Sequence, residues 1–178
     1  MTDWVVRHFG GRIIRVPVDE HGMDVHRIGS ICRNQKIRAI YLTPHHHYPT
    51  TVTMSAERRM ELLRIAEQHD IVLVEDDYDY DYHYEGAPIL PLASMSRGNV
   101  IYVGSFSKQL APSVRVGYLT GNPVFIEQVS RIRRIIDRQG DPLLEFALAE
   151  MIREGRFSVI FGKPFTSTGN EGTFFAAF

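Results

Sequence analysis

Short apolar runs and amphipathic helical patterns alternate along most of this chain. Runs rich in β-branched residues predict strands, because such residues pack well on a pleated surface. These runs are Arg12–Val18, Ile37–Leu42, Ile71–Val74, Val100–Val103 and Val114–Leu119. Ile71–Val74 is continuously apolar, which predicts a strand covered on both of its faces.

Apolar residues at helical spacing predict helices between these strands. The clearest helix begins after Ser55, a residue type that caps helix N-termini, has Glu57 in its first turn and continues to about His69. The other predicted helices are Asp24–Cys32, about Pro123–Arg138 and about Pro142–Arg153. Strands that alternate with helices indicate an α/β fold with a mostly parallel sheet flanked by helices.

Ligands of such sheets bind beyond the carboxyl ends of the strands. Polar residues follow two of the predicted strands, at Glu75–Tyr78 and at Ser105–Lys108. We therefore expect the functional site at these two strand ends.

The composition is that of an ordinary globular protein. Of 178 residues, 44% are hydrophobic and 23% are charged, and the formal net charge is −1. This balance gives no electrostatic basis for a nucleic-acid or membrane partner. Cys32 is the single cysteine, so no internal disulfide can form. The sequence has no apolar stretch of membrane-spanning length and no signal-peptide pattern, so we expect a cytoplasmic location.

The residues after Val100–Val103 suit a phosphate-bearing aldehyde. Ser105 and Ser107 supply hydroxyls, Lys108 an amine, and Arg115 follows a little further along. Hydroxyls and a guanidinium can hold a phosphate, while an amine can form a Schiff base with a carbonyl. The alternative is a surface lysine that is simply hydrated.

Asp76 places a carboxylate at the end of a predicted strand. A carboxylate there can pair with a protonated ring nitrogen, as the chemistry of pyridoxal phosphate requires. Tyr78 can place its phenol near the ring oxygen of the same cofactor. Two alternatives stay open: Asp76 and Asp77 cap the following turn, or the acidic cluster binds calcium, although its spacing lacks the glycine-centred pattern of an EF-hand loop. The cluster comprises Asp76, Asp77, Asp79, Asp81 and Glu85.

Three consecutive histidines, His45–His47, invite a metal interpretation. Consecutive side chains do not share a face in a strand or a helix, so they form a poor site for one metal ion. We expect a turn here, bracketed by Pro44 and Pro49, and no metal.

Four motifs together carry a resemblance to a known family. They are Tyr41–Thr50, Val74–Asp79, Val100–Lys108 and Leu110–Tyr118. In this order and spacing they resemble a fold-type I pyridoxal-phosphate-dependent aminotransferase of class I/II, and more narrowly the aminotransferase-like domain of MocR-type GntR transcriptional regulators. The resemblance covers roughly Arg12–Gly155 and implies the central part of the large domain of that fold.

The resemblance implies the cofactor pyridoxal 5'-phosphate and a role for each matching residue. Lys108 is the catalytic residue, which forms the Schiff base and shuttles the proton at the substrate Cα. Asp76 binds the pyridinium nitrogen, and Tyr78 binds the ring oxygen. The phosphate is held by Ser105, Ser107 and Arg115. The implied substrate is an amino acid or amine, and full-length relatives are implied to be homodimers.

Tyr48–Thr50 occupies the place of the Asn-Pro-Thr-Gly turn of ordinary aminotransferases. The family's asparagine contacts the cofactor there, and Tyr48 in its place favours the regulator branch. Thr51 occupies the position at which the family usually has glycine. Because a β-branched residue resists a positive φ angle, we expect a distorted turn.

We divide the chain into a partial large domain, residues 1–155, and a divergent, poorly ordered tail, residues 156–178. Nothing in the sequence resembles the winged helix-turn-helix of these regulators, so we expect no DNA-binding domain in this chain. The pattern also lacks the family's phosphate turn and small domain. We therefore expect the chain alone to bind cofactor weakly and to turn over amino acids poorly or not at all.

Three functions stay open at this point. The first is a pyridoxal-phosphate-dependent, aminotransferase-like enzyme. The second is the effector domain of a MocR-type regulator, which uses the same site to sense an amine or the cofactor. The third is an inactive, truncated remnant.

Overall fold

The structure is a computed structural model that describes residues 2–79, 89–108, 110–136, 138, 140–154 and 174–177. Its helices are α1 (Thr2–His8), α2 (Val25–Asn34), α3 (Ala56–Gln68), α4 (Leu92–Met95), α5 (Pro123–Ile136) and α6 (Pro142–Arg153). Its strands are β1 (Val18–Asp19), β2 (Gly22–Met23), β3 (Ala39–Leu42), β4 (Val72–Asp77), β5 (Val100–Ser105), β6 (Gly117–Gly121) and β7 (Phe174–Ala177).

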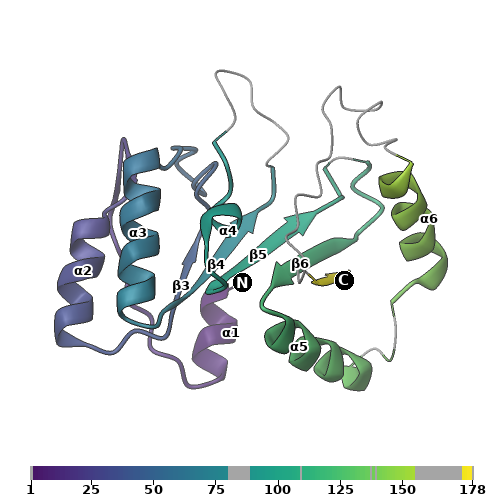
Figure 1. The fold of residues 1–178 in the computed structure, drawn as a ribbon, viewed down its shortest axis with the longest axis horizontal. Helices are drawn as coiled ribbons and strands as arrows, with labels where there is room; N and C mark the ends of the chain where they lie inside the picture. The colour runs from purple at the N-terminus through teal and green to yellow at the C-terminus, as the bar shows by residue number, and fades with distance from the viewer. Residues whose placement is uncertain are drawn as a thin grey trace.

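The main sheet has the strand order β3-β4-β5-β6-β7 over the described residues (Figure 1). β3, β4 and β5 run parallel, whereas β6 is antiparallel to β5 and β7 is antiparallel to β6. The direction therefore reverses only at β6, and the other strands share one direction. The prediction of an α/β fold with a mostly parallel sheet is confirmed.

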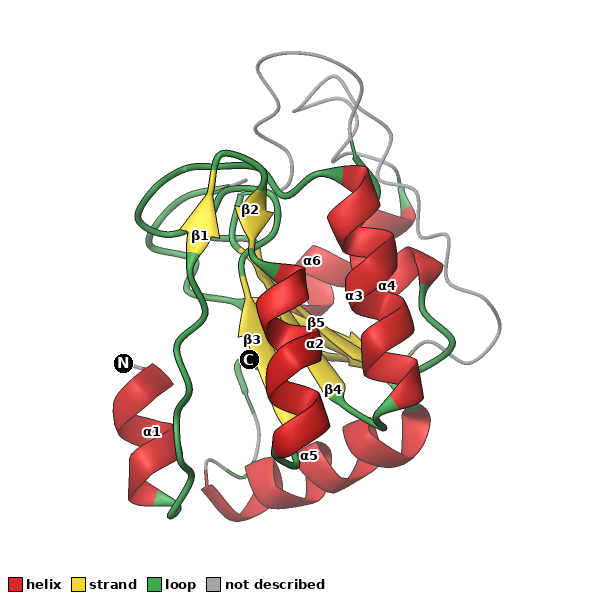
Figure 2. Ribbon diagram, turned by 90° about the vertical axis from the view of Figure 1, so that its left-hand side faces the viewer, coloured by secondary structure: helices red, strands yellow, loops and turns green. Residues whose placement is uncertain are grey.

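One face of this sheet carries the main core. α2, α3 and α4 stand together on that side, while α1 lies on the other side of β3 (Figure 2). The side chains packed between the sheet and these helices are less than 5% exposed, and they include Leu42, Leu62, Leu73, Leu92 and Val100. A second, smaller cluster joins α6 to the turn between β5 and β6 through Phe106, Val116 and Leu148.

The prediction that Ile71–Val74 is covered on both faces is wrong. Leu73, Glu75 and Asp77 of β4 are buried on the helix side, whereas Val72 is 37% exposed on the other. Because side chains alternate along a strand, β4 presents one buried and one partly open face. Its apolar sequence did not reveal this difference.

The predicted strand Arg12–Val18 is also wrong. Only Val18 belongs to a strand, β1, which pairs with β2 through Val18–Met23 and Asp19–Gly22. Pro17 has no backbone N–H to donate to a ladder, so β-branched composition alone does not make this segment a strand.

The predicted helices are confirmed, and their caps explain where they begin. The Ser55 hydroxyl accepts a hydrogen bond from Arg58 N at 3.4 Å, and Asp24 accepts one from Arg27 N at 3.0 Å. Asp141 caps α6 in the same way, with Pro142 at the first helical position. None of the described helices is long and apolar enough to cross a membrane.

The chain after β5 differs from the prediction in detail. The strand expected at Val114–Leu119 begins later, as β6, because Val114 belongs to the preceding turn and donates its N–H to Ala111 O. Most of the predicted tail lies outside the described residues, but Phe174–Ala177 pairs with β6 as β7. The division at residue 155 stays a prediction.

Candidate functional site

The carboxyl ends of β3, β4 and β5 meet at one edge of the sheet and carry the candidate residues. In this parallel arrangement Leu42 pairs with Glu75, and Asp76 pairs with Val103. The segments that follow the three strands therefore lie next to one another. They contain the predicted site residues Tyr48, Tyr78, Ser107 and Lys108.

Asp76 lies on the partly open face of β4, opposite the helix layer. The Tyr41 hydroxyl, from the neighbouring strand β3, donates a hydrogen bond to Asp76 Oδ2. Burial, followed by this bond to the carboxylate, raises the pKa of Tyr41 well above its ordinary value. Tyr41 therefore remains protonated and acts as the donor.

Tyr78 and Lys108 come together from different strand ends. Lys108 Nζ lies 4.5 Å from the centroid of the Tyr78 ring, within the range of a cation–π contact. The Tyr78 hydroxyl donates to the His46 carbonyl at 2.9 Å. Burial and then the charge of Asp79 raise the pKa of Tyr78, so its hydroxyl stays a donor.

Asp79 links this lysine to the histidine turn. Its Oδ2 lies 3.7 Å from Lys108 Nζ and 3.0 Å from His46 Nδ1. The sequence marked Asp79 only as a possible calcium ligand. The useful signal was its position three residues after Asp76, beyond the same strand end.

Ser105 and Ser107 flank a tight turn at the end of β5. Ser107 N donates to Ser105 Oγ at 3.2 Å, and Phe106 N donates to Val116 O at 3.0 Å. The ladder between β5 and β6 ends at the pair Ser105–Gly117, so Arg115 lies two residues before β6. Arg115 is exposed, and its φ of 51° turns the chain into β6.

Tyr48 lies on the turn that follows β3, and its side chain is 75% exposed. Its backbone N–H donates to Thr43 Oγ1 at 3.1 Å, and its hydroxyl contributes electrostatically to the raised pKa of Tyr78, after burial and the nearby aspartates. Thr51 adopts a φ of 61°, so the turn requires the left-handed conformation that the usual glycine provides.

A buried polar cluster lies directly behind the site. His45 Nδ1 is 2.7 Å from Asp77 Oδ2, and both side chains are about 1% exposed or less. The Tyr102 hydroxyl donates to the same Asp77 oxygen at 3.1 Å, and His45 Nε2 lies 2.7 Å from Ile89 O. The sequence does not reveal this pairing, because three consecutive histidines give no sign of which one faces the core.

Glu75, rather than the predicted Asp76 or Asp77, acts as a cap, and it caps the helix α4. It is fully buried, and its two carboxylate oxygens accept hydrogen bonds from Leu92 N and Ala93 N at 2.9 Å each. Burial raises its pKa, and these bonds oppose the rise only in part. Consecutive acidic residues therefore serve opposite faces of β4.

The described residues contain no group of three or more His, Cys, Asp or Glu side chains that could hold a metal ion. Two of the acidic residues considered for calcium, Asp81 and Glu85, lie outside the described residues.

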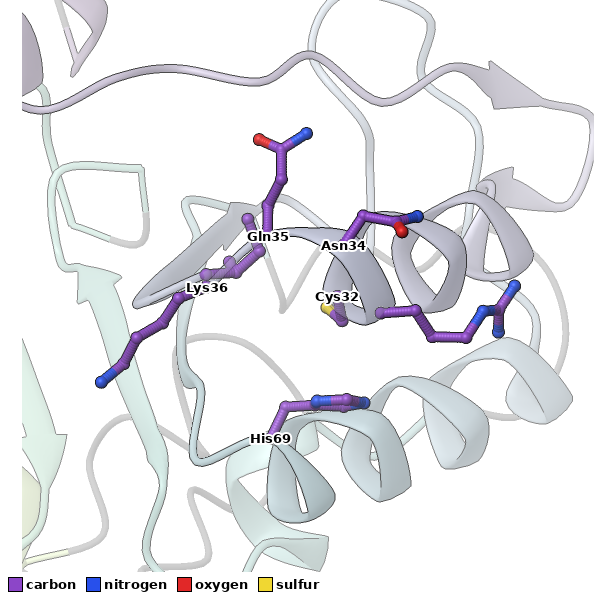
Figure 3. Close-up of a pocket in the computed structure, with 7 residues that line it drawn as sticks. Cys32, Asn34, Gln35, Lys36 and His69 are labelled. Carbon is purple, nitrogen blue, oxygen red and sulfur yellow. The ribbon is translucent and has the colours of Figure 1, made fainter.

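A hollow of about 350 Å³ lies at the opposite edge of the sheet (Figure 3). Its lining includes Cys32, Lys36 and His69, which lie at or beyond the ends of α2 and α3. Lys36 precedes β3 and His69 precedes β4, so the hollow is at the amino ends of these strands, away from the site.

The fold and these residues correspond to a known family. The family model for aminotransferase class I and II matches residues 2–156, and the chain belongs to this family.

Two kinds of relative share this part of the chain. The probable rhizopine catabolism regulatory protein MocR of Rhizobium meliloti is 33% identical over 84% of this chain and 30% of its own length. The aromatic-amino-acid aminotransferase 1 of Thermococcus litoralis is 31% identical over 74% of this chain and 33% of its own length. The chain thus spans about a third of these relatives.

Solved structures give the same result. Kynurenine aminotransferase of Pyrococcus horikoshii, solved in complex with PMP, superimposes with a TM-score of 0.81 and 28% identity, over 85% of this chain and 39% of that one. An archaeal alanine:glyoxylate aminotransferase gives a TM-score of 0.79 and 32% identity, over 89% of this chain and 41% of that one. The domain is aminotransferase-like in sequence and in fold.

Proposed function

We propose that this aminotransferase-like domain binds pyridoxal phosphate covalently through Lys108 and acts on an amino acid or amine. The observation that carries the proposal is the position of the Lys108 amine over the ring of Tyr78. Lys108 follows β5, and Tyr78 follows β4, the strand that bears Asp76. A cytoplasmic location and a homodimeric parent protein belong to the same proposal.

The chemistry of the donor set fits this cofactor. Asp76 offers a carboxylate, the group that pairs with a protonated ring nitrogen. The Tyr41 hydroxyl already donates a hydrogen bond to this carboxylate. Two hydroxyls at the end of β5, Ser105 and Ser107, together with the guanidinium of Arg115 just before β6, suit a phosphate. Tyr48 and Tyr78 supply phenols on the two neighbouring segments.

When bound, pyridoxal phosphate supplies an electron sink that makes a substrate Cα–H bond acidic. Lys108 would hold the cofactor through its nucleophilic amine and would serve as the base for the substrate Cα proton. Asp79 orients this amine through its contact at 3.7 Å, and the Tyr78 ring supports it from one side. Asp76 would pair with the ring nitrogen and keep it protonated.

Regulation is the second candidate function. The MocR similarity and the presence of Tyr48 in the cofactor turn favour a domain that senses an amine rather than one that turns it over. The two functions differ in outcome: an enzyme releases a carbonyl product from an amino acid, whereas a sensor binds the amine without releasing a product.

The experiment is covalent trapping. The chain is incubated with pyridoxal phosphate, reduced with borohydride and digested, and mass spectrometry locates the adduct. The chain has three lysines, Lys36, Lys108 and Lys163, so the assignment is direct. We expect the adduct on Lys108 and its loss in Lys108→Ala.

Lys36→Ala is the matched control, because Lys36 lies at the far edge of the sheet. It is expected to label as the wild type does. Equal labelling of all three lysines, or labelling that survives Lys108→Ala, would contradict the proposal. A panel of amino acids and amines, assayed for carbonyl product, then separates the enzyme from the sensor.

A further inference from the structure

Tyr41 occupies a defined position beside the candidate cofactor carboxylate. β3 and β4 are adjacent and parallel, and Tyr41 pairs with Val74. Side chains alternate along a strand, so Tyr41, Val74 and Asp76 share the partly open face. The long tyrosine side chain reaches two residues along the neighbouring strand, where its hydroxyl donates to Asp76 Oδ2.

We propose that Tyr41 is a positioning residue that fixes the Asp76 carboxylate for the cofactor ring. The inference rests on the function proposed above. A carboxylate that accepts a hydrogen bond from a rigid strand residue loses rotational freedom, and bonds to charged acceptors are the strong ones. Asp76 is thereby oriented before any ligand arrives, which lowers the cost of binding.

The surroundings of Tyr41 keep its hydroxyl a donor. Burial, then the bond to Asp76, raises its pKa, and Tyr78, just beyond the strand that carries Asp76, adds to the effect. A side-chain hydrogen bond with Thr2 of α1 acts in the opposite direction. Tyr41 is nevertheless 44% exposed, so removing one oxygen leaves no buried void.

Tyr41→Phe in the full chain tests the inference, because it removes only the hydroxyl. We expect the dissociation constant for pyridoxal phosphate to rise about tenfold, as for the loss of one hydrogen bond to a charged group. The melting temperature should stay near that of the wild type. At saturating cofactor, Lys108 should still be trapped by borohydride, because the amine itself is unchanged.

Tyr102→Phe is the matched control. It removes a tyrosine hydroxyl from the strand on the other side of β4, and that hydroxyl contacts Asp77 rather than Asp76. Its cofactor affinity should change by less than about twofold. If both variants weaken binding equally, the effect is general loosening and the positioning role is refuted.

The failures of the two proposals are distinguishable. If the wild type binds the cofactor and Tyr41→Phe binds it equally tightly, the positioning role is overturned and the proposed function stands. If the wild type itself binds no cofactor, the proposed function fails and the role in cofactor binding fails with it. Whether Tyr41 holds the Asp76 carboxylate is then measured separately, on the cofactor-free protein.

The measurement on the cofactor-free protein uses fluorotyrosine, whose hydroxyl ionises at a lower pH than that of tyrosine. The fluorine resonance that disappears in Tyr41→Phe belongs to Tyr41, and its titration is compared in the wild type and in Asp76→Asn. Because the charge of Asp76 helps to raise the pKa of Tyr41, we expect Asp76→Asn to lower the pH at which this residue ionises. An unchanged titration overturns the inference.

Discussion

Gly104, next to the candidate site, shows how a single position can restrict packing. A Cβ built at Gly104 would lie 2.2 Å from Cζ of Tyr118. The Tyr118 ring cannot move aside freely, because it also packs against Phe106, with ring centroids 5.0 Å apart, and against Tyr102, at 6.0 Å. The Tyr118 ring therefore fits against β5 only because Gly104 has no side chain.

We predict that Gly104→Ala lowers the free energy of unfolding by about 2 kcal/mol through overpacking. Gly29→Ala is the contrasting variant, because Gly29 lies inside α2 and its Cβ would meet only Ile65 Cδ1, at 3.6 Å. It should raise stability by about 0.5–1 kcal/mol. Urea unfolding measures both, and a neutral Gly104→Ala would show that the ring shifts at little cost.

At the scale of elements, α4 depends on one buried carboxylate. Glu75 accepts hydrogen bonds from the first two N–H groups of this short helix. The N-cap residue, Pro91, makes no side-chain capping hydrogen bond. Because the pKa of Glu75 is raised from 4.5, its contribution to stability is fully present below that pH and decreases as the pH rises through the folded-state value.

Glu75→Gln is therefore expected to destabilise the protein most at acid pH. A glutamine offers one acceptor oxygen for two N–H groups, which costs about 1–3 kcal/mol. The difference in the free energy of unfolding between this variant and the wild type should narrow as the pH rises above 4.5. The reason is that the Glu75 carboxyl group acquires a buried charge, whereas the glutamine does not. Urea titrations across pH measure it. Glu127→Gln, on exposed α5, controls for the substitution itself, and a difference that is constant with pH would contradict the prediction.

The elements that the sequence predicts well are those whose signals are local. Ser55 and Asp24 cap helices through neighbouring N–H groups, so their effect is visible in a short window. The direction of β6 and the inclusion of β7 are set by pairing between distant segments, which no local pattern encodes.

The candidate site divides in the same way. Asp76, Tyr78 and Lys108 were predicted because they follow apolar strands, and the structure brings Tyr78 and Lys108 together. Tyr41 and the pair His45–Asp77 were missed, because each depends on which neighbour a side chain faces across the sheet. Such partners follow from strand order, which requires the three-dimensional fold.

Across the whole molecule, burial is uneven. The larger cluster lies under α2, α3 and α4, whereas α5 buries only Ile126 among its described residues. Ile132, Ile135 and Ile136 of the same helix are 57%, 84% and 77% exposed. The free energy of local opening should therefore differ between the two halves.

We predict that backbone amides of β4 and α3 exchange hydrogen at least about 100-fold more slowly than those of α5 and α6. Fewer buried apolar contacts allow the latter helices to open without unfolding the sheet. Native-state hydrogen exchange with mass spectrometry measures the ratio. Uniform protection along the chain would instead show that both halves unfold as one cooperative unit.

The alternation along β4 also restricts how this gene can change. Glu75 and Asp77 face the helices, whereas Asp76 faces the open side next to Tyr41. Deleting one residue from Val72–Val74 would exchange these faces, removing the α4 cap and the partner of His45 together. Substitutions in this strand can accumulate singly, but a change in its length would disrupt both the core and the site, so we expect length to be the invariant property of this segment.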